Sequence, residues 1–273
     1  MLIKRIVTAI IGVIAATYII NYGQWLFALA AGVIALLAWR EFCKMFAAKS
    51  LILWDKLGVI GIILLLGCSW AGNSQEINMV VLLLTLLTIG KTVFDSHYNI
   101  VHAAITLLGI VYIGLAFSHL ILLRFTDHIV IASSMLGSLS AGTVFIWIAF
   151  IGTWANDTVA FFVGSNLGKH KLCPAISPGK TIEGAVGGAA GGIIVIALLG
   201  ILLKFSLLHS VMIGLLIGLA APLGDLAESA IKRFAGVKDS GNILPGHGGI
   251  LDRFDSIMFV VPVVYYYMQF FIV

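Results

Sequence analysis

The chain has 273 residues, of which 61% are hydrophobic and only 10% are charged, and its formal net charge is +4. A mean hydropathy of +1.12 lies far outside the range of soluble globular domains, which excludes a soluble enzyme and leaves no room for a large domain outside the membrane. Because one helical span needs about 20 residues, the sequence predicts an all-α fold, a polytopic integral membrane helical bundle.

Hydropathy predicts about nine transmembrane helices along the chain. The expected spans are residues 6–21, 24–40, 57–72, 77–91, 101–123, 143–163, 183–203, 207–222 and 256–272. Residues 129–142 are expected to form a re-entrant or surface piece. The first apolar run resembles a signal peptide, but the second follows within a few residues, which favours a hairpin of two spans. We expect residues 1–142 to supply N-terminal transmembrane helices, and residues 143–273 to form a C-terminal transmembrane catalytic region.

The basic residues predict the orientation of these spans. With a cytoplasmic N-terminus and alternating spans, fourteen of the sixteen Lys and Arg residues fall on cytoplasmic segments, and only Arg124 and Lys204 fall outside. This bias follows the positive-inside rule. We therefore expect a multi-pass protein of the cell inner (plasma) membrane, with its active site facing the cytoplasm. The basic pI of about 9.0 indicates attraction to anionic headgroups and phosphorylated ligands, and it requires no nucleic acid.

A first polar cluster lies in "WANDTVAFFVGSNLGKHKLCPAISPGKTIEG", residues 154–184. Asn156 and Asp157 stand at the edge of a predicted span, and Lys169, Lys171 and Lys180 follow in a polar loop. Lysines in such a loop suit a polyphosphate as point charges, although they also fit a purely topological role. The run of glycine and alanine that follows is expected to let two helices pack closely.

A second cluster runs from Asp225 to Asp255 and holds nine of the chain's 28 charged residues. Asp225 and Glu228 are spaced i, i+3, and Asp252 and Asp255 repeat that spacing at the last span. Carboxylates clustered at helix ends in a membrane are costly unless a cation neutralises them, and oxygen ligands of this kind suit Mg²⁺. The alternative is a cytoplasmic loop in which these acids pair with the neighbouring lysines and arginines.

Within this segment, "LPGHGG" places Pro245, Gly246, Gly248 and Gly249 around His247. The pattern predicts a tight turn with close backbone approach or positive φ directly before a helix N-terminus, where amide groups favour an anion. We expect His247 to act as a hydrogen-bonding or orienting group.

The stretch "SAIKRFAGVKDSGNILPGHGGILDRFD", Ser229 to Asp255, resembles the signature of the phosphatidate cytidylyltransferase family, also called CDP-diacylglycerol synthases. The preceding "LGDLAES" and the segment "ANDTVAFFVGSNLGKHKL" are also similar to that family, so the resemblance covers about residues 150–256. One departure is Asn156, where the bacterial family commonly has a small residue, and this leaves the role of Asn156 open.

The resemblance implies a Mg²⁺-dependent nucleotidyltransferase of phospholipid biosynthesis, which uses CTP and phosphatidic acid to form CDP-diacylglycerol and pyrophosphate. It also implies contact with membrane lipids, a homodimer, and one or two metal ions, of which the second could be monovalent. The implied catalytic residues are Asp225, Asp252, Lys238, Asp239, His247 and Arg253, and the implied metal ligands are Asp225, Asp252, Asp255 and Glu228. The implied substrate-binding residues are Asn156, Asp157, Lys169, Lys171, Ser177, Lys180, Thr181, Glu183, Ser229, Lys232, Arg233, Gly248 and Gly249.

Two other classes of membrane protein use acidic residues in similar places. A CDP-alcohol phosphotransferase would carry the pattern D-G-x2-A-R-x8-G-x3-D-x3-D, which is absent from this sequence. A transporter would need polar residues near the middle of its spans. Here such residues are scarce, and the charges gather toward one membrane face. The transferase is therefore the favoured hypothesis.

Overall fold

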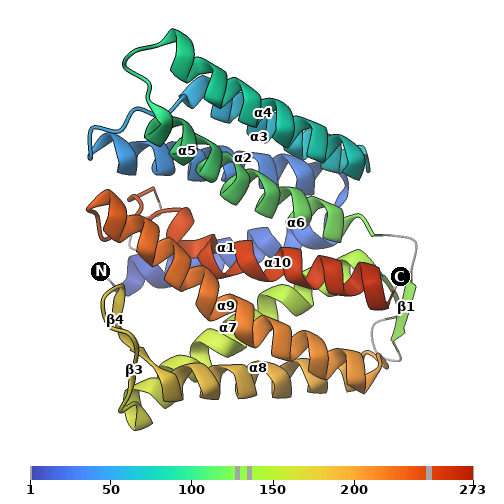
Figure 1. The fold of residues 1–273 in the computed structure, drawn as a ribbon. Helices are drawn as coiled ribbons and strands as arrows, with labels where there is room; N and C mark the ends of the chain where they lie inside the picture. Colours follow the sequence, from blue (N-terminus) through green and yellow to red (C-terminus); the bar gives the residue numbers. More distant parts are fainter. Residues whose placement is uncertain (1, 127–129, 134–136, 244–247, 273) are drawn as a thin grey trace. The chain divides into compact units, whose positions relative to one another are not determined.

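The computed structural model describes residues 2–126, 130–133, 137–243 and 248–272, and most of these residues are helical (Figure 1). The helices are α1 (Leu2–Tyr22), α2 (Gln24–Ala47), α3 (Asp55–Trp70), α4 (Ser74–Phe94), α5 (Ile100–Gly109), α6 (Ala116–Arg124), α7 (Ala141–Leu167), α8 (Ile182–Leu202), α9 (Leu207–Ala235) and α10 (Leu251–Phe271). A π-helical segment, η1 (Ile110–Leu115), joins α5 to α6, so these three form one continuous span.

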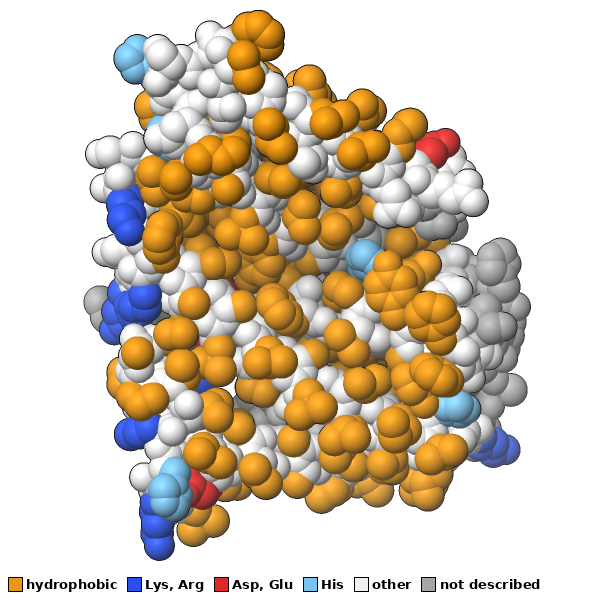
Figure 2. Space-filling view, viewed as in Figure 1, with side chains coloured by type: hydrophobic (Ala, Val, Ile, Leu, Met, Phe, Trp, Pro, Cys, Tyr) orange, Lys and Arg blue, Asp and Glu red, His pale blue; other side chains and the backbone are white. Residues whose placement is uncertain are grey.

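The helices confirm an all-α, multi-pass membrane protein. Each of the nine predicted spans coincides with a helical segment, and within the described residues seven of these are long and apolar enough to cross a membrane. The other two are α3, which has 16 residues, and α1, whose apolar stretch Ile10–Tyr22 is also short. Hydrophobic side chains cover much of the surface shown in Figure 2, as expected where lipid tails replace water.

Two short antiparallel hairpins interrupt the helices, and hydropathy did not predict them. Strand β1 (Val130–Ser133) pairs with β2 (Gly137–Ser140) in the segment that was expected to be a re-entrant or surface piece. Strand β3 (Lys171–Cys173) pairs with β4 (Ser177–Thr181), with Lys171 opposite Thr181. The second hairpin thus forms part of the basic loop and leads directly into α8.

The chain forms two compact units, which are described separately. The first comprises residues 1–122 and 232–254, and the second comprises residues 123–231 and 255–273. Helices α9 and α10 contribute residues to both units. This grouping follows packing, whereas the expected division at residue 142 concerned function and stays a prediction.

In the first unit, α2 packs against α1, α3 and η1 and supplies a fully buried aromatic row. Trp39 stacks on Phe42 with ring centroids 6.0 Å apart, and the indole Nε1 of Trp39 donates to Asp55 Oδ1 at 2.8 Å, at the start of α3. Gly58 and Gly109 lie against these rings with no room for a Cβ atom. The large rings and the small residues opposite them therefore set the spacing between α2 and its neighbours.

In the second unit, glycines bring α7, α8 and α9 together. A Cβ atom at Gly188 of α8 would lie 2.8 Å from the backbone oxygen of Asn156 in α7, and one at Gly214 of α9 would lie 2.7 Å from Ile193 Cα. The Gly/Ala run of α8 therefore acts as predicted, because small residues let helix backbones approach closely in lipid. Thr181 is the N-cap of α8, and its hydroxyl accepts the Gly184 N–H at 3.1 Å.

Candidate active site

In the second unit, three predicted site residues from three different elements meet. Lys180, at the end of β4, places Nζ 2.6 Å from Oδ2 of Asp225 in α9. Asp157 of α7 interacts electrostatically with both of these residues. The Ser229 hydroxyl donates to Asp225 Oδ1 at 3.4 Å. Two carboxylates and one ammonium group thus form a compact charged cluster, here called the Asp157–Lys180–Asp225 cluster.

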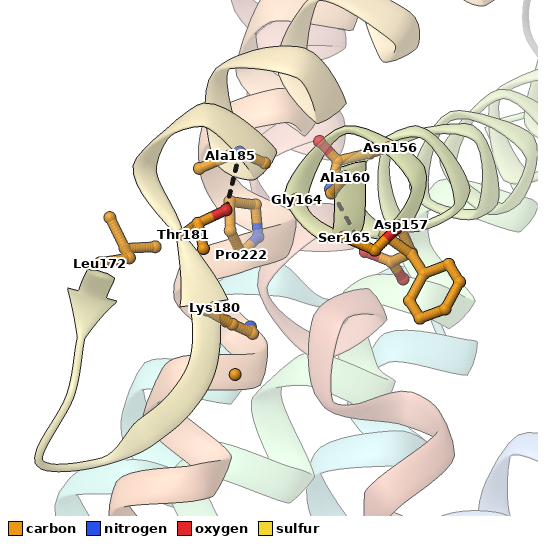
Figure 3. A pocket seen from close by; sticks show the side chains of 13 residues that line it. Asn156, Asp157, Ala160, Gly164, Ser165, Leu172, Lys180, Thr181, Ala185 and Pro222 are labelled. Carbon is orange, nitrogen blue, oxygen red and sulfur yellow. Dashed lines mark hydrogen bonds between the residues drawn. The ribbon is translucent and has the colours of Figure 1, made fainter. Parts of the chain in front are cut away.

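Asp157 and Lys180 of this cluster line a pocket of about 390 Å³ (Figure 3). On its polar side the pocket is lined by Asn156, Asp157, Lys180 and Thr181, whereas its other walls include Ala160, Phe161, Leu172 and Pro222. The Asn156 side chain is only 2% exposed, and its Nδ2 donates to Asp157 Oδ1 at 3.2 Å. Asn156, whose role the sequence left open, therefore helps to orient the Asp157 carboxylate. The pocket combines a charged end with apolar walls.

The rest of the basic loop is organised by Glu183, in the first turn of α8. Its carboxylate accepts the backbone N–H of Lys169 at 3.1 Å and that of His170 at 3.2 Å, and it lies 2.6 Å from His170 Nδ1. Glu183 thus fixes the loop that precedes the β3–β4 hairpin. Lys169 and Lys171 are exposed and Ser177 is half-buried in β4, and their predicted substrate contacts stay predictions.

In the first unit, the site residues gather around Asp252, in the first turn of α10. Asp252 Oδ1 accepts from Lys232 Nζ at 2.7 Å, and Oδ2 accepts from the backbone N–H of Gly249 at 2.9 Å. Ser240 donates to the same carboxylate through its backbone N–H at 3.1 Å and its hydroxyl at 2.9 Å. The side chains of Lys232 and Asp252 are only 12% and 9% exposed. Ser240 and Gly249 of the signature stretch therefore contact the first turn of α10 through Asp252.

The local geometry requires glycine at positions 248 and 249. Gly248 has φ +84°, and a Cβ atom there would lie 2.9 Å from Asp252 Oδ2. A Cβ atom at Gly249 would lie 2.6 Å from Oε2 of Glu41, a residue of α2. The predicted positive φ is thus confirmed at Gly248, and close backbone approach is found at both positions. Pro245, Gly246 and His247 lie outside the described residues.

Glu41 is a residue of this region that the sequence did not point to. It is 2% exposed, and its Oε2 accepts the Leu251 N–H at 3.0 Å. A usable signal was present in the sequence, because an acid at the end of an apolar span is costly and usually has a functional reason. The sequence prediction treats the first half of the chain as a hydrophobic multi-span region and therefore does not include Glu41.

The remaining predicted residues differ in their exposure and in their hydrogen-bond partners. Lys238, Asp239 and Arg253 are exposed, whereas Glu228 is 1% exposed within α9. The guanidinium of Arg233 donates to the Val237 carbonyl at 3.3 Å. Asp255 accepts the Ser256 N–H at 2.7 Å.

Two of the predicted metal ligands contact lysines, because Asp225 lies beside Lys180 and Asp252 accepts from Lys232. Among the described residues, no three His, Cys, Asp or Glu side chains form a group that could hold a metal ion by themselves. Mg²⁺ usually takes only one or two carboxylates and completes its shell with waters and substrate phosphates. The Asp157–Lys180–Asp225 cluster offers such a pair of oxygen donors, so its residues fit this ion.

Comparison with known proteins extends these observations to the whole chain. The cytidylyltransferase family matches residues 3–271. The chain belongs to this family. It is 35% identical to a phosphatidate cytidylyltransferase of Staphylococcus saprophyticus over 264 residues, which cover 94% of this chain and 95% of that protein. Phosphatidate cytidylyltransferases of Staphylococcus aureus strain COL and Staphylococcus haemolyticus are 35% and 34% identical, with the same coverage of both chains. The family therefore includes the N-terminal helices, beyond the stretch that carried the sequence resemblance.

Proposed function

We propose that this chain is a phosphatidate cytidylyltransferase of phospholipid biosynthesis, which converts CTP and phosphatidic acid into CDP-diacylglycerol and pyrophosphate. The observation that carries the proposal is the pocket beside the Asp157–Lys180–Asp225 cluster, within a chain of the cytidylyltransferase family. Its charged end suits phosphate groups and its apolar walls suit a lipid. Family membership favours this reaction over the CDP-alcohol phosphotransferase and the transporter.

The reaction requires few proton transfers but strong charge compensation. An oxygen of the lipid phosphate attacks the α-phosphorus of CTP, the bond to the β-phosphate breaks, and pyrophosphate leaves with the electron pair. The lipid phosphate is already ionised near neutral pH, so the site needs no strong general base. Instead it must hold two polyanions in line and screen their repulsion. In this proposal the ammonium group of Lys180, beside Asp225, supplies part of that screening.

The proposal includes Mg²⁺, held by Asp225 with Asp157 as the second oxygen donor. When bound, the ion would neutralise phosphate charge and orient the leaving pyrophosphate. The part of this chain is to keep both carboxylates in place, which Lys180, Ser229 and Asn156 do through the contacts described above. Metal contacts of Asp252, Asp255 and Glu228, and a second ion that could be monovalent, stay predictions.

The proposal also specifies location and assembly. One substrate is confined to the bilayer and the other to water, so the site belongs at a membrane surface. The positive-inside bias supports the cytoplasmic face of the inner (plasma) membrane. Resemblance to the family supports a homodimer.

The proposed activity can be tested with the full chain purified in detergent. Pyrophosphate and CDP-diacylglycerol should form only when CTP and phosphatidic acid are both present. Activity should be lost on addition of EDTA and restored by excess Mg²⁺. Asp225→Asn should lower kcat by about 100-fold or more, because it removes a charge that acts on the reacting groups.

A matched control is Asp95→Asn, which also removes the acid of an Asp–Lys pair, since Lys91 Nζ lies 3.6 Å from Asp95 Oδ2. That pair is outside the candidate site, so its loss should leave kcat near normal. A wild-type protein without CTP-dependent pyrophosphate release would refute the activity. A fully active Asp225→Asn variant would refute the assignment of the site.

A further inference from the structure

The carboxylate of Glu41 is buried near the C-terminal end of α2, where the rest of the buried surface is formed by residues such as Ala38, Trp39, Phe42 and Met45. A charged group in such surroundings is costly unless it is held by hydrogen bonds. Among the described residues its hydrogen-bond donors come from the signature stretch, 199 and 210 residues away along the chain.

One donor lies in the loop that precedes α10, and the other is the first residue of α10. Glu41 Oε2 accepts the backbone N–H of Leu251, the first residue of α10, at 3.0 Å. It also lies 3.3 Å from the hydroxyl of Ser240. The first amides of a helix have no partner within the helix and carry the positive end of its dipole, so an acid there is stabilising. Glu41 therefore acts as a remote cap for α10.

The backbone at Gly241 and Gly249 lies against this carboxylate. A Cβ atom at Gly241 would lie 2.5 Å from Glu41 Oε1, and one at Gly249 would lie 2.6 Å from Oε2. Neither position could carry a side chain without displacing the acid. The two glycines and Glu41 thus form one packed contact between α2 and the signature stretch.

The same contact leads directly to Asp252. The Ser240 hydroxyl, which faces Glu41, lies 2.9 Å from Asp252 Oδ2, so its single proton is shared between two carboxylates. Asp252 in turn accepts from Lys232. A second contact anchors the same stretch to the turn that follows α2, because Lys49 Nζ donates to the Phe234 carbonyl at 2.6 Å.

From these contacts we infer that Glu41 is a positioning residue of the transferase. It holds Ser240 and the start of α10, and through them it keeps Asp252 and Lys232 in their working arrangement. Its role in catalysis rests on the proposed function, whereas its role in ordering the loop does not. The inference therefore assigns a residue of the N-terminal helices a role in the transferase reaction.

The test compares Glu41→Ala and Glu41→Gln in the full-length protein. Glu41→Ala should lower kcat by about 100-fold, since a shift of about 1 Å in a site can cost that much. KM for CTP should change less than kcat. Glu41→Gln keeps an oxygen that can accept the Leu251 N–H, so it should recover most of the lost rate. Such rescue is not expected of a residue that only fills space.

A second readout does not depend on activity. Hydrogen–deuterium exchange of peptides within residues 238–252 should be faster in Glu41→Ala than in the wild type, whereas peptides of α3 and α4 should be unchanged. The matched control is Asp55→Ala, which removes a carboxylate that holds Trp39 in the same unit. It should reduce thermal stability but leave kcat and the exchange of residues 238–252 unchanged.

The outcomes separate the two proposals. An inactive wild-type protein would refute the activity, and the exchange measurement would still decide the role of Glu41. A Glu41→Ala variant with normal kcat, or with normal exchange in residues 238–252, would overturn the inference. If Glu41→Ala does not fold, Glu41→Asp takes its place. Its shorter side chain should not reach Ser240 and Leu251 together, so the same changes are expected.

Discussion

At the scale of single residues, the Asp252 carboxylate shows how hydrogen bonds stabilise a buried charge in the signature stretch. A largely buried carboxylate is tolerated only when hydrogen bonds replace its water, and here Lys232, Ser240 and Gly249 supply them. Each of these contacts also fixes part of the loop. The acid, the lysine and the loop amides therefore stabilise one another, and a change in one should disturb the others.

Gly248 allows this interdependence to be tested. Gly248→Ala should cost about 1–2 kcal/mol of stability, because φ is +84° and the left-handed region is unfavourable for alanine. Its Cβ atom would also push against Asp252 Oδ2, so activity should fall more than stability accounts for. Thermal unfolding and initial rates on the folded fraction measure the two effects.

Gly236→Ala is the control, because Gly236 has a similar φ of +80° but has no atom within 4 Å of the added Cβ. It should show the same loss of stability with nearly normal activity. Equal activities in the two variants would contradict the link between the turn and Asp252.

At the scale of elements, the contact between α7 and α8 builds the pocket. Glycines along α8 let the two backbones approach, and this brings Asn156 and Asp157 of α7 beside Lys180 and Thr181, which directly precede α8. In lipid such close contact relies on packing and on small residues, since there is little hydrophobic driving force between helices. The distance between these helices therefore determines the shape of the site.

Gly188→Val should force α8 away from α7, because its Cβ atom would lie 2.8 Å from both the Asn156 oxygen and the Ala160 Cβ. Overpacking of this kind typically costs about 1–3 kcal/mol. We expect a lower thermal midpoint and a raised KM, because the pocket between the two helices is distorted. Gly90→Val in α4 is the matched control, since no atom lies within 4 Å of its added Cβ. Similar losses in both variants would refute the role assigned to the α7–α8 contact.

At the scale of the whole molecule, the helices define a multi-pass membrane protein, and the distribution of Lys and Arg along the sequence supports the proposed orientation. The proposed orientation places the loop between α7 and α8 in the cytoplasm and the loop between α8 and α9 outside. A helix that crosses the membrane must have its ends on opposite sides, so labelling the two ends of α8 tests this orientation.

Two single-cysteine variants make the test, Ala175→Cys and Ser206→Cys, each with Cys43, Cys68 and Cys173 replaced by serine. Both positions are exposed in the structure. In spheroplasts with an intact inner membrane, a membrane-impermeant maleimide should label Ser206→Cys but not Ala175→Cys. After lysis it should label both. The reverse pattern in intact spheroplasts would show that the proposed orientation is wrong.

Much of the fold could be predicted from the sequence, because the bilayer imposes a strong and simple constraint. A span must be apolar over about 20 residues and must satisfy its own backbone, so hydropathy located every helical segment in turn. The same constraint made the polar residues stand out, and Lys180, Asp225, Lys232 and Asp252 were singled out for that reason. Local backbone rules similarly pointed to Gly248, whose positive φ the structure confirms.

The partners of these residues could not be predicted, because they are brought together only by packing between distant segments. Sequence spacing put Asp225 with Glu228, whereas the structure pairs Asp225 with Lys180, which the β3–β4 hairpin delivers from another part of the chain. Glu41 is the extreme case, since nothing near residue 41 indicates a contact with residues 240 and 251. The hydropathy of a segment depends only on its own residues, so it can be read from the sequence. Which acid meets which amide is decided by helix packing, and only the tertiary structure contains it.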